Sequence, residues 1–347
     1  MDAAIGAGVI TREQADALMA MEARGSLPAR AFAPDDEQFR FIRGFGDIFV
    51  TIGLALFLVA VAYFAHSVGE VVGAFVGLAA ASWGLAEYFT RIRRMALPSI
   101  VLLLVFAYSV YGAAGTLLGQ IAGDTESFRM WLLNTASPPV MIGAGAVTAI
   151  AAALHYWRFR VPITVAAGAG ALVAIVVGLA IAAGLPRDVA ILAMGFAVFA
   201  LAMRYDLSDP QRVTRRTDIA FWLHMLAAPL VVHPLIGSFS NGSRLFSLEG
   251  PGVATAAWIL GVFAALALVA LIVDRRAMLV SGLSYAGIAF SALVGKAGLS
   301  GQVPLTLLVL GALVLILSAG WHSLRRPLLR LLPERLSQGL AHNTIQT

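Results

Sequence analysis

One apolar stretch of the sequence combines two histidines with two internal prolines. It reads IAFWLHMLAAPLVVHPLIGSFS. A proline inside a helix has no amide proton, so the carbonyl four residues earlier loses its partner. In a membrane, such carbonyls are satisfied by protein or face a water-filled cavity, and transporters place substrate sites at interrupted helices. The candidate substrate or ion path therefore consists of His224, Met225, Pro229, Leu230, His233 and Pro234. A proline kink packed against a neighbouring helix is the alternative, and the pattern leaves both open.

A second group of polar residues follows the first apolar run, in YFAHSVGEVVG. The chain must turn back here, so His66 would end one helix and Glu70 would begin the next. A cation at a helix C-terminus and an anion at a helix N-terminus both suit the helix dipole, which explains the pair without a ligand. The hypothesis of a binding role adds two further polar residues from the same side. This candidate outer vestibule consists of His66, Glu70, Gln120 and Asp124.

Other site chemistry is not indicated. The sequence has no cysteine, and none of the common hydrolase, phosphate-binding or dinucleotide-binding motifs is present. The six histidines would be distributed over both sides of a membrane, so we predict no metal site and no cofactor. An enzyme is the least favoured of the function classes, because the sequence lacks a catalytic constellation.

The elements that must position these residues are membrane helices. Hydrophobic residues make up 60% of the 347 residues and charged residues only 12%, about half the share of a soluble domain. The net charge of +5 is spread over many short connections and not over one soluble face, so we predict no nucleic-acid partner. The sequence predicts an all-α, polytopic integral membrane protein whose main partner is the lipid bilayer.

Ten apolar runs are long enough to span the hydrocarbon core, which needs about 20 residues of helix. They are residues 46–65, 69–89, 97–121, 138–156, 161–184, 186–203, 219–240, 251–273, 277–295 and 302–322. If the N-terminus is inside, 20 of the 24 basic residues fall in inner segments, as the positive-inside rule expects. We therefore predict a bacterial cytoplasmic (inner) membrane protein with both termini cytoplasmic. The domains would be 1–45 (cytosolic helix and linker), 46–322 (helical bundle) and 323–347 (basic cytosolic tail).

The cytosolic segment is expected to begin with one short helix, because Thr11 and Gln14 have the spacing of a capping box. Residues 53–60 and 195–202 share a weak similarity, which hints at two inverted halves of five spans. No Asp, Glu, Lys or Arg lies near the middle of a predicted span, and this argues against a carboxylate-driven antiporter.

The first third of the chain resembles a family of bacterial membrane proteins known as domain of unknown function 2157. Three segments carry the resemblance: GVITREQADAL, IGLALFLVAVAYFAHSVGE and GAAGTLLGQIAG, within about residues 7–122. Ala65, His66, Glu70, Gly119 and Gln120 fit the family pattern. The resemblance implies that the polar turn after the first span is a recurrent feature of the family.

Two functions stay open at the level of the sequence. The first is a small-solute transporter or permease with its path near the proline-containing span. The second is a membrane sensor or scaffold whose N-terminal helix docks a cytosolic protein partner. The sequence favours the first by architecture alone, which is an analogy.

Overall fold

The structure is a computed structural model that describes residues 5, 6, 8, 11–23, 45–123, 137–209, 214–240, 252–298 and 302–330 of the chain. The chain divides into two units, residues 1–38 with 343–347 and residues 39–342, and each is described by itself. The described residues form helices, turns and short connections, with no strand among them. The all-helical prediction is confirmed for this part of the chain.

The N-terminal unit contains one well-formed helix, α2 (Arg12–Ala23). The backbone N–H of Thr11 donates to Oε1 of Gln14 at 2.9 Å, and the backbone N–H of Gln14 donates to Oγ1 of Thr11 at 3.2 Å. These reciprocal bonds are the capping box that the sequence predicts, and they satisfy two amides that a helix start leaves without partners.

Replacing Thr11 by alanine is expected to destabilise α2 by about 1 kcal/mol, because the alanine cannot accept from the Gln14 amide. Hydrogen exchange of the full-length protein would show this as faster exchange of the amides in the first turn of α2. Thr11→Ser keeps the hydroxyl and should leave the exchange rates near those of the parent. Equal rates in the alanine variant would show that the capping box contributes nothing to the helix.

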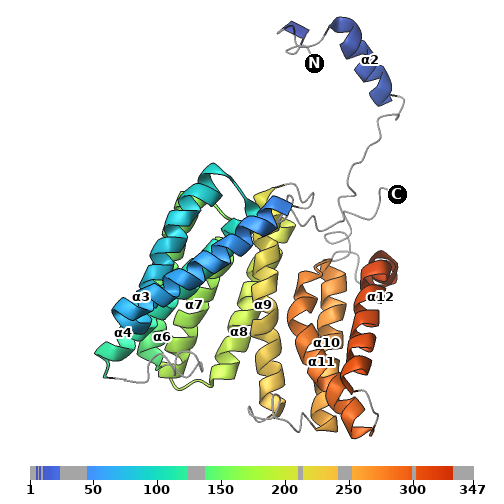
Figure 1. Cartoon of the computed structure of the whole chain (residues 1–347). Coiled ribbons are helices and arrows are strands. Elements are labelled where there is room, and N and C mark those ends of the chain that lie inside the picture. Colours follow the sequence, from blue (N-terminus) through green and yellow to red (C-terminus); the bar gives the residue numbers. More distant parts are fainter. Residues whose placement is uncertain are drawn as a thin grey trace. The chain divides into compact units, whose positions relative to one another are not determined.

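The second unit is built from long helices joined by short connections (Figure 1). They are α3 (Phe45–Ala86), η1 (Glu87–Ile92), α4 (Ala96–Ile121), α6 (Pro138–Phe159), α7 (Ile163–Ala182), α8 (Arg187–Leu207), α9 (Arg215–Ser240), α10 (Val253–Val273), α11 (Ala277–Lys296) and α12 (Gln302–Arg330). α12 continues as a helix beyond the predicted end of the last span at residue 322, while residues 331–347 lie outside the described part.

Helix α3 folds back on itself at the polar turn. Gly69 (φ −134°, ψ 26°) and Glu70 (φ 51°, ψ −141°) have non-helical backbone angles. A methyl group placed on Gly73 would lie 2.5 Å from the carbonyl oxygen of Ala65, and one on Gly77 would lie 2.6 Å from the Ala65 Cβ. Such contacts are possible only if the two arms run side by side. The predicted hairpin between the first two apolar runs is therefore confirmed, with its turn at Gly69 and Glu70.

Within the described residues, eight helices are long and apolar enough to cross a membrane, judged by length and composition. The first of these, residues 45–92, contains the fold-back just described. The set has the character of a multi-pass membrane protein. In this arrangement α9 packs against α7, α8, α10 and α11, and Figure 1 shows it between the N-terminal helices and the α10–α12 group.

Five of the seven positive-φ positions described in the bundle recur at a fixed spacing. Residues with positive φ end three helical segments at Glu70 (51°), Gly184 (82°) and Gly298 (68°), which are 114 residues apart. The same spacing separates Arg160 (56°) from Asp274 (62°), the residues that end α6 and α10. A backbone that needs positive φ is uncommon outside glycine, so five such positions in one register indicate a repeat.

The hydrogen bonds of these turns repeat with the same spacing. The amide of Ala183 donates to the carbonyl of Leu179 at 2.9 Å, and that of Ala297 donates to Leu293 at 3.0 Å. The shift of 114 residues also places the limits of α7 on those of α11 and, within one residue, the limits of α6 on those of α10. The starts of α8 and α12 agree within one residue, while α4 and α9 are offset by five residues. Corresponding helices lie four helices apart in the chain and so run in the same direction. We infer two four-helix repeats that run in the same direction, the first from the second arm of α3 to α7 and the second from α8 to α11. This pattern differs from the two inverted halves of five spans at which the sequence hinted.

Candidate functional site

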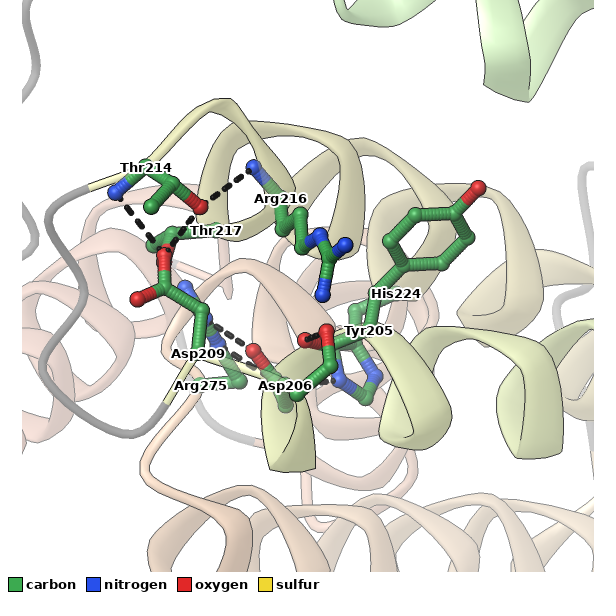
Figure 2. Close-up of polar contacts among 9 residues, drawn as sticks. Tyr205, Asp206, Asp209, Thr214, Arg216, Thr217, His224 and Arg275 are labelled. Carbon is green, nitrogen blue, oxygen red and sulfur yellow. Dashed lines mark hydrogen bonds and ion pairs between the residues drawn. The ribbon is translucent and has the colours of Figure 1, made fainter.

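A buried cluster of ionisable side chains joins α8 to α9. Nε2 of His224, in the third turn of α9, lies 2.7 Å from Oδ2 of Asp206, in the last turn of α8 (Figure 2). The His224 side chain is 0% exposed and that of Asp206 is 15% exposed. An ionised carboxylate only accepts, so Nε2 carries the proton and donates it to Asp206.

Arg275 completes the cluster from the turn between α10 and α11. Its Nε donates to Oδ2 of Asp206 at 3.2 Å, and its Nη2 donates to Oδ1 of the same carboxylate. The Arg275 side chain is 2% exposed. The guanidinium thus holds the carboxylate with two parallel bonds, the strongest geometry for this pair. Asp206 is shared between a permanent cation and an imidazole.

The helix ends explain why these residues meet. An aspartate in the last turn of a helix lies at the negative end of the helix dipole, so Asp206 needs cationic or donor partners there. The connection to α9 is fixed by a second aspartate, Asp209. Its Oδ2 accepts from the amide of Thr214 at 2.8 Å, from the Thr214 hydroxyl at 2.6 Å and from the Thr217 hydroxyl at 3.0 Å. This cap sets the start of α9 and places His224 beside Asp206 (Figure 2).

The second ring nitrogen of His224 has no hydrogen-bond partner. Its Nδ1 is buried and unpaired among the residues that the structure describes, and the Phe199 ring centroid is 5.4 Å away. Burying a ring nitrogen without a hydrogen-bond partner costs free energy. Because Nε2 carries the proton, Nδ1 has a free lone pair that can accept another. An imidazole beside a carboxylate that also pairs with a guanidinium can accept or release a proton when water reaches it.

Of the candidate path, only His224 belongs to this cluster. α9 is one continuous helix from Arg215 to Ser240 and includes both prolines, so the interrupted helix of the transporter hypothesis is not observed. Pro234 is buried, and Met225, Pro229 and Leu230 are half-buried.

The carbonyl freed by Pro234 packs against the neighbouring helix. A methyl group on Gly195 of α8 would lie 2.9 Å from the carbonyl carbon of Leu230 and 3.0 Å from its oxygen. The backbone of Gly195 therefore packs closely against this carbonyl. The Leu230 carbonyl takes part in a close contact between helices, as the kink alternative expects.

His233 lies in a different environment from His224. Its Nδ1 is 2.7 Å from the hydroxyl of Tyr285 on α11, and its side chain is exposed. Nine residues of helix separate the two histidines by about 13 Å along the axis. The structure therefore does not bring the two histidines of the candidate path together.

The residues of the candidate outer vestibule are only partly described by the structure, and its role as a binding site stays a prediction. His66, Glu70 and Gln120 are exposed, and no hydrogen bond or ion pair joins any two of them. Asp124 lies outside the described residues. No group of three or more His, Asp or Glu side chains that could hold a metal ion is present among the residues described.

A related acid–arginine pair lies in the first repeat. Arg158, near the end of α6, donates from Nε to Oε1 of Glu87 at 2.7 Å and from Nη2 to Oε2 at 2.8 Å. Both side chains are about one-third exposed, at 34% and 33%. α6 corresponds to α10 in the repeat. In the first repeat the pair joins η1 to the end of α6, and in the second repeat it joins the end of α8 to the turn after α10. Only the second repeat adds a histidine.

Sequence reasoning missed Asp206 and Arg275. Both stand at helix ends, where a charge is ordinarily solvated, and the predicted span ended at residue 203. α8 instead continues to Leu207. The signal in the sequence was a histidine early in one span and an aspartate just after the end of the preceding span, but this pattern does not specify that the two side chains meet.

No protein-family model, no curated protein and no solved structure matches the chain. The resemblance of the first third to domain of unknown function 2157 stays a prediction from its motifs. What the structure itself defines is the class: a helical, multi-pass architecture with tandem repeats and a buried Asp–His–Arg cluster.

Proposed function

We propose that the protein is a proton-coupled transporter of a small solute in a bacterial cytoplasmic membrane. The proposed topology is the ten spans of the sequence prediction, with both termini on the cytoplasmic side. The observation that carries the proposal is the fully buried His224, bonded to Asp206 through Nε2 and unpartnered at Nδ1. Ionisable residues inside membrane spans are costly and usually mark proton or ion pathways.

The architecture supports this class of protein. Parallel internal repeats related by an axis along the membrane normal are one of the two repeat patterns found in secondary transporters, where the repeats move against each other. The α8–α9 hairpin opens the second repeat and packs on α7 of the first. The cluster therefore lies at the helices that join the two repeats, where a relative movement would change its access to water.

The role of each residue follows from its chemistry. His224 accepts and releases the coupled proton at Nδ1, and Asp206 orients the ring and stabilises the imidazolium. Arg275 balances the carboxylate while His224 is neutral. Protonation of His224 puts a second cation beside Asp206. Water can solvate this added charge when the cluster is open, so protonation is favoured there and disfavoured when the cluster is closed. This difference is what coupling requires.

The test uses full-length protein in vesicles that contain the pH dye pyranine. Pools of amino acids, sugars, nucleosides and carboxylates are added outside in turn. At least one pool should change the internal pH with the parent protein, and His224→Asn should slow this change at least about tenfold, since the proton acceptor is lost. Vesicles without protein and the variant Asp188→Asn, at the opposite end of α8, serve as controls. No pH response to any pool, or a full response in His224→Asn, would overturn the proposal.

A sensor or scaffold is the second candidate function. It is favoured by one observation, the self-capped helix α2 in a unit separate from the helical bundle. In that case α2 would bind a cytosolic protein partner. This alternative expects no solute-dependent proton movement, so the vesicle experiment separates the two functions.

A further inference from the structure

The turn between α10 and α11 engages two other helices, α8 and α12, through three consecutive residues. Arg275 holds Asp206 on α8, beside His224 on α9. The residue before it faces α12: Oδ1 of Asp274 accepts from Nε1 of Trp321 at 2.7 Å. The Asp274 side chain is buried, and Trp321 is 1% exposed. The direction of Arg275 is therefore set from the opposite side by α12.

Two further contacts fasten the turn to α12. Nη1 of Arg325 lies 3.7 Å from Oδ2 of Asp274. The guanidinium carbon of Arg276 stands 5.1 Å from the centroid of the Trp321 ring, within the range of a cation–π interaction. Trp321 therefore contacts the residues on both sides of Arg275, through its N–H on one side and its ring face on the other.

The corresponding turn of the first repeat shows that these charges are not needed to form the turn. Residues 160–162 have the same positive φ at the first position, and the amide of Thr164 donates to the carbonyl of Val161 as that of Met278 donates to Arg275. That turn has valine and proline in place of Arg275 and Arg276. The backbone is common to both repeats, while the buried charges belong to the second one alone.

We propose that Asp274 and Trp321 are positioning residues that hold Arg275 on Asp206 and thereby set how readily His224 takes up a proton. The inference rests on the proposed function for its biological purpose, but not for its test. When Arg275 pairs with Asp206, the carboxylate is neutralised and stabilises an imidazolium less. When Arg275 is released, the carboxylate faces His224 alone and protonation of the ring becomes easier.

The charged groups on the helices around His224 come from α8 and α9. α7 and α10 contain no titratable residue. α8 contributes Asp206 and also carries Arg187, Asp188 and Arg204, and the first turn of α9 carries Arg215, Arg216 and Asp218. The hydroxyl of Tyr205, also on α8, is directed away from His224 in Figure 2. On α11, Tyr285 is bonded to His233 and Lys296 ends the helix at its far end. Arg275 is thus the cation whose position controls the Asp206–His224 pair.

The experiment follows His224 directly in the full-length protein in lipid nanodiscs. The chain has six histidines, so spectra of ¹⁵N-histidine-labelled protein are assigned to His224 by comparison with His224→Asn. The pH midpoint of its ring nitrogens is then measured. In Arg275→Gln the midpoint should rise by about one pH unit or more. Trp321→Phe keeps an aromatic side chain but removes the N–H donor, and it should shift the midpoint in the same direction by less.

Asp274 offers a pair of variants that separates the side chain from the backbone. Its φ of 62° suits asparagine and glycine. Asp274→Asn keeps an oxygen that accepts from Trp321 and should stay close to the parent midpoint. Asp274→Gly keeps the backbone but removes the acceptor, and it should raise the midpoint as Trp321→Phe does. Arg160→Gly, at the corresponding position of the first repeat, should leave the midpoint unchanged.

The outcomes distinguish this inference from the proposed function. Unchanged midpoints in Trp321→Phe and Asp274→Gly, with a raised midpoint in Arg275→Gln, would overturn the positioning role alone. Raised midpoints in all three, without any solute response in vesicles, would support the positioning role and overturn the transporter. A midpoint that falls in Arg275→Gln would contradict the electrostatic argument itself.

Discussion

Replacing Asp206 by asparagine is expected to lower the free energy of unfolding by about 3 kcal/mol. The substitution keeps the size of the side chain but removes its charge. Arg275, which is 2% exposed, then keeps its buried positive charge without the carboxylate that pairs with it. The cost of a buried charge without a partner exceeds the value of the pair itself, which is why a single-partner change is so severe. Thermal unfolding of the full-length protein in nanodiscs would measure it.

The first repeat supplies a matched control for this change. Glu87→Gln breaks the related bidentate pair with Arg158, but both of those side chains are about one-third exposed. Water can solvate the remaining guanidinium, so the expected cost is much smaller than that of Asp206→Asn. The double variant Asp206→Asn/Arg275→Gln removes both buried charges and should recover most of the lost stability. Equal losses in the Asp206 and Glu87 variants would show that burial of Arg275 is not the cause.

The helices were predictable because the apolar runs leave little choice. Residues 97–121 and 277–295 were predicted as spans, and the structure has helices Ala96–Ile121 and Ala277–Lys296. The turn at Gly69 and Glu70 also followed from length, because one straight helix from 45 to 92 would be far longer than a membrane is thick. The number of ten spans and the orientation rest on the charge pattern of the loops and remain part of the proposal.

The repeat was not predictable from sequence similarity. Membrane helices draw on a few apolar residue types, so chance matches such as 53–60 with 195–202 are common. What repeats is backbone geometry, and it does so through unlike residues: Glu70 stands where the other copies have Gly184 and Gly298. Only the backbone angles show that these residues occupy equivalent turns.

The site was half predictable for a related reason. His224 and Pro234 drew attention as unusual residues within an apolar run. The sequence shows that Pro234 removes the helix hydrogen bond of the Leu230 carbonyl, and this carbonyl was therefore a candidate ligand. The sequence does not show which neighbouring residue packs against the carbonyl instead. Asp206 lies in the last turn of α8, and Arg275 lies in the turn between α10 and α11. Whether they contact His224 depends on how these segments pack against α9, which periodicity and composition do not specify.

The contact between Gly195 and Leu230 leads to the second prediction with a large expected effect. Gly195→Ala should lower the free energy of unfolding, whereas Gly→Ala in a helix ordinarily raises it. In a helix interior, Gly→Ala ordinarily stabilises by up to about 1 kcal/mol, because alanine has the higher helix propensity. At Gly195 the new methyl group would lie 2.9 Å from the carbonyl carbon of Leu230 and 2.9 Å from Cγ2 of Val231. Backbone atoms cannot turn aside, so α8 and α9 must separate. We expect Gly195→Ala to destabilise the protein by about 2 kcal/mol, as overpacking of a close contact does.

Gly261 on α10 is the matched control, because nothing lies within 4 Å of a methyl group placed there. Gly261→Ala should leave the unfolding temperature unchanged or raise it slightly, while Gly195→Ala should lower it. Separation of α8 from α9 would also lengthen the bond between Asp206 and His224, so the ¹⁵N signals of His224 should change in Gly195→Ala and not in Gly261→Ala. A stabilising effect at Gly195 would mean that the α8–α9 contact is looser than the structure shows. The carbonyl of Leu230 would then again be free to act as a ligand, and the interrupted-helix hypothesis would return.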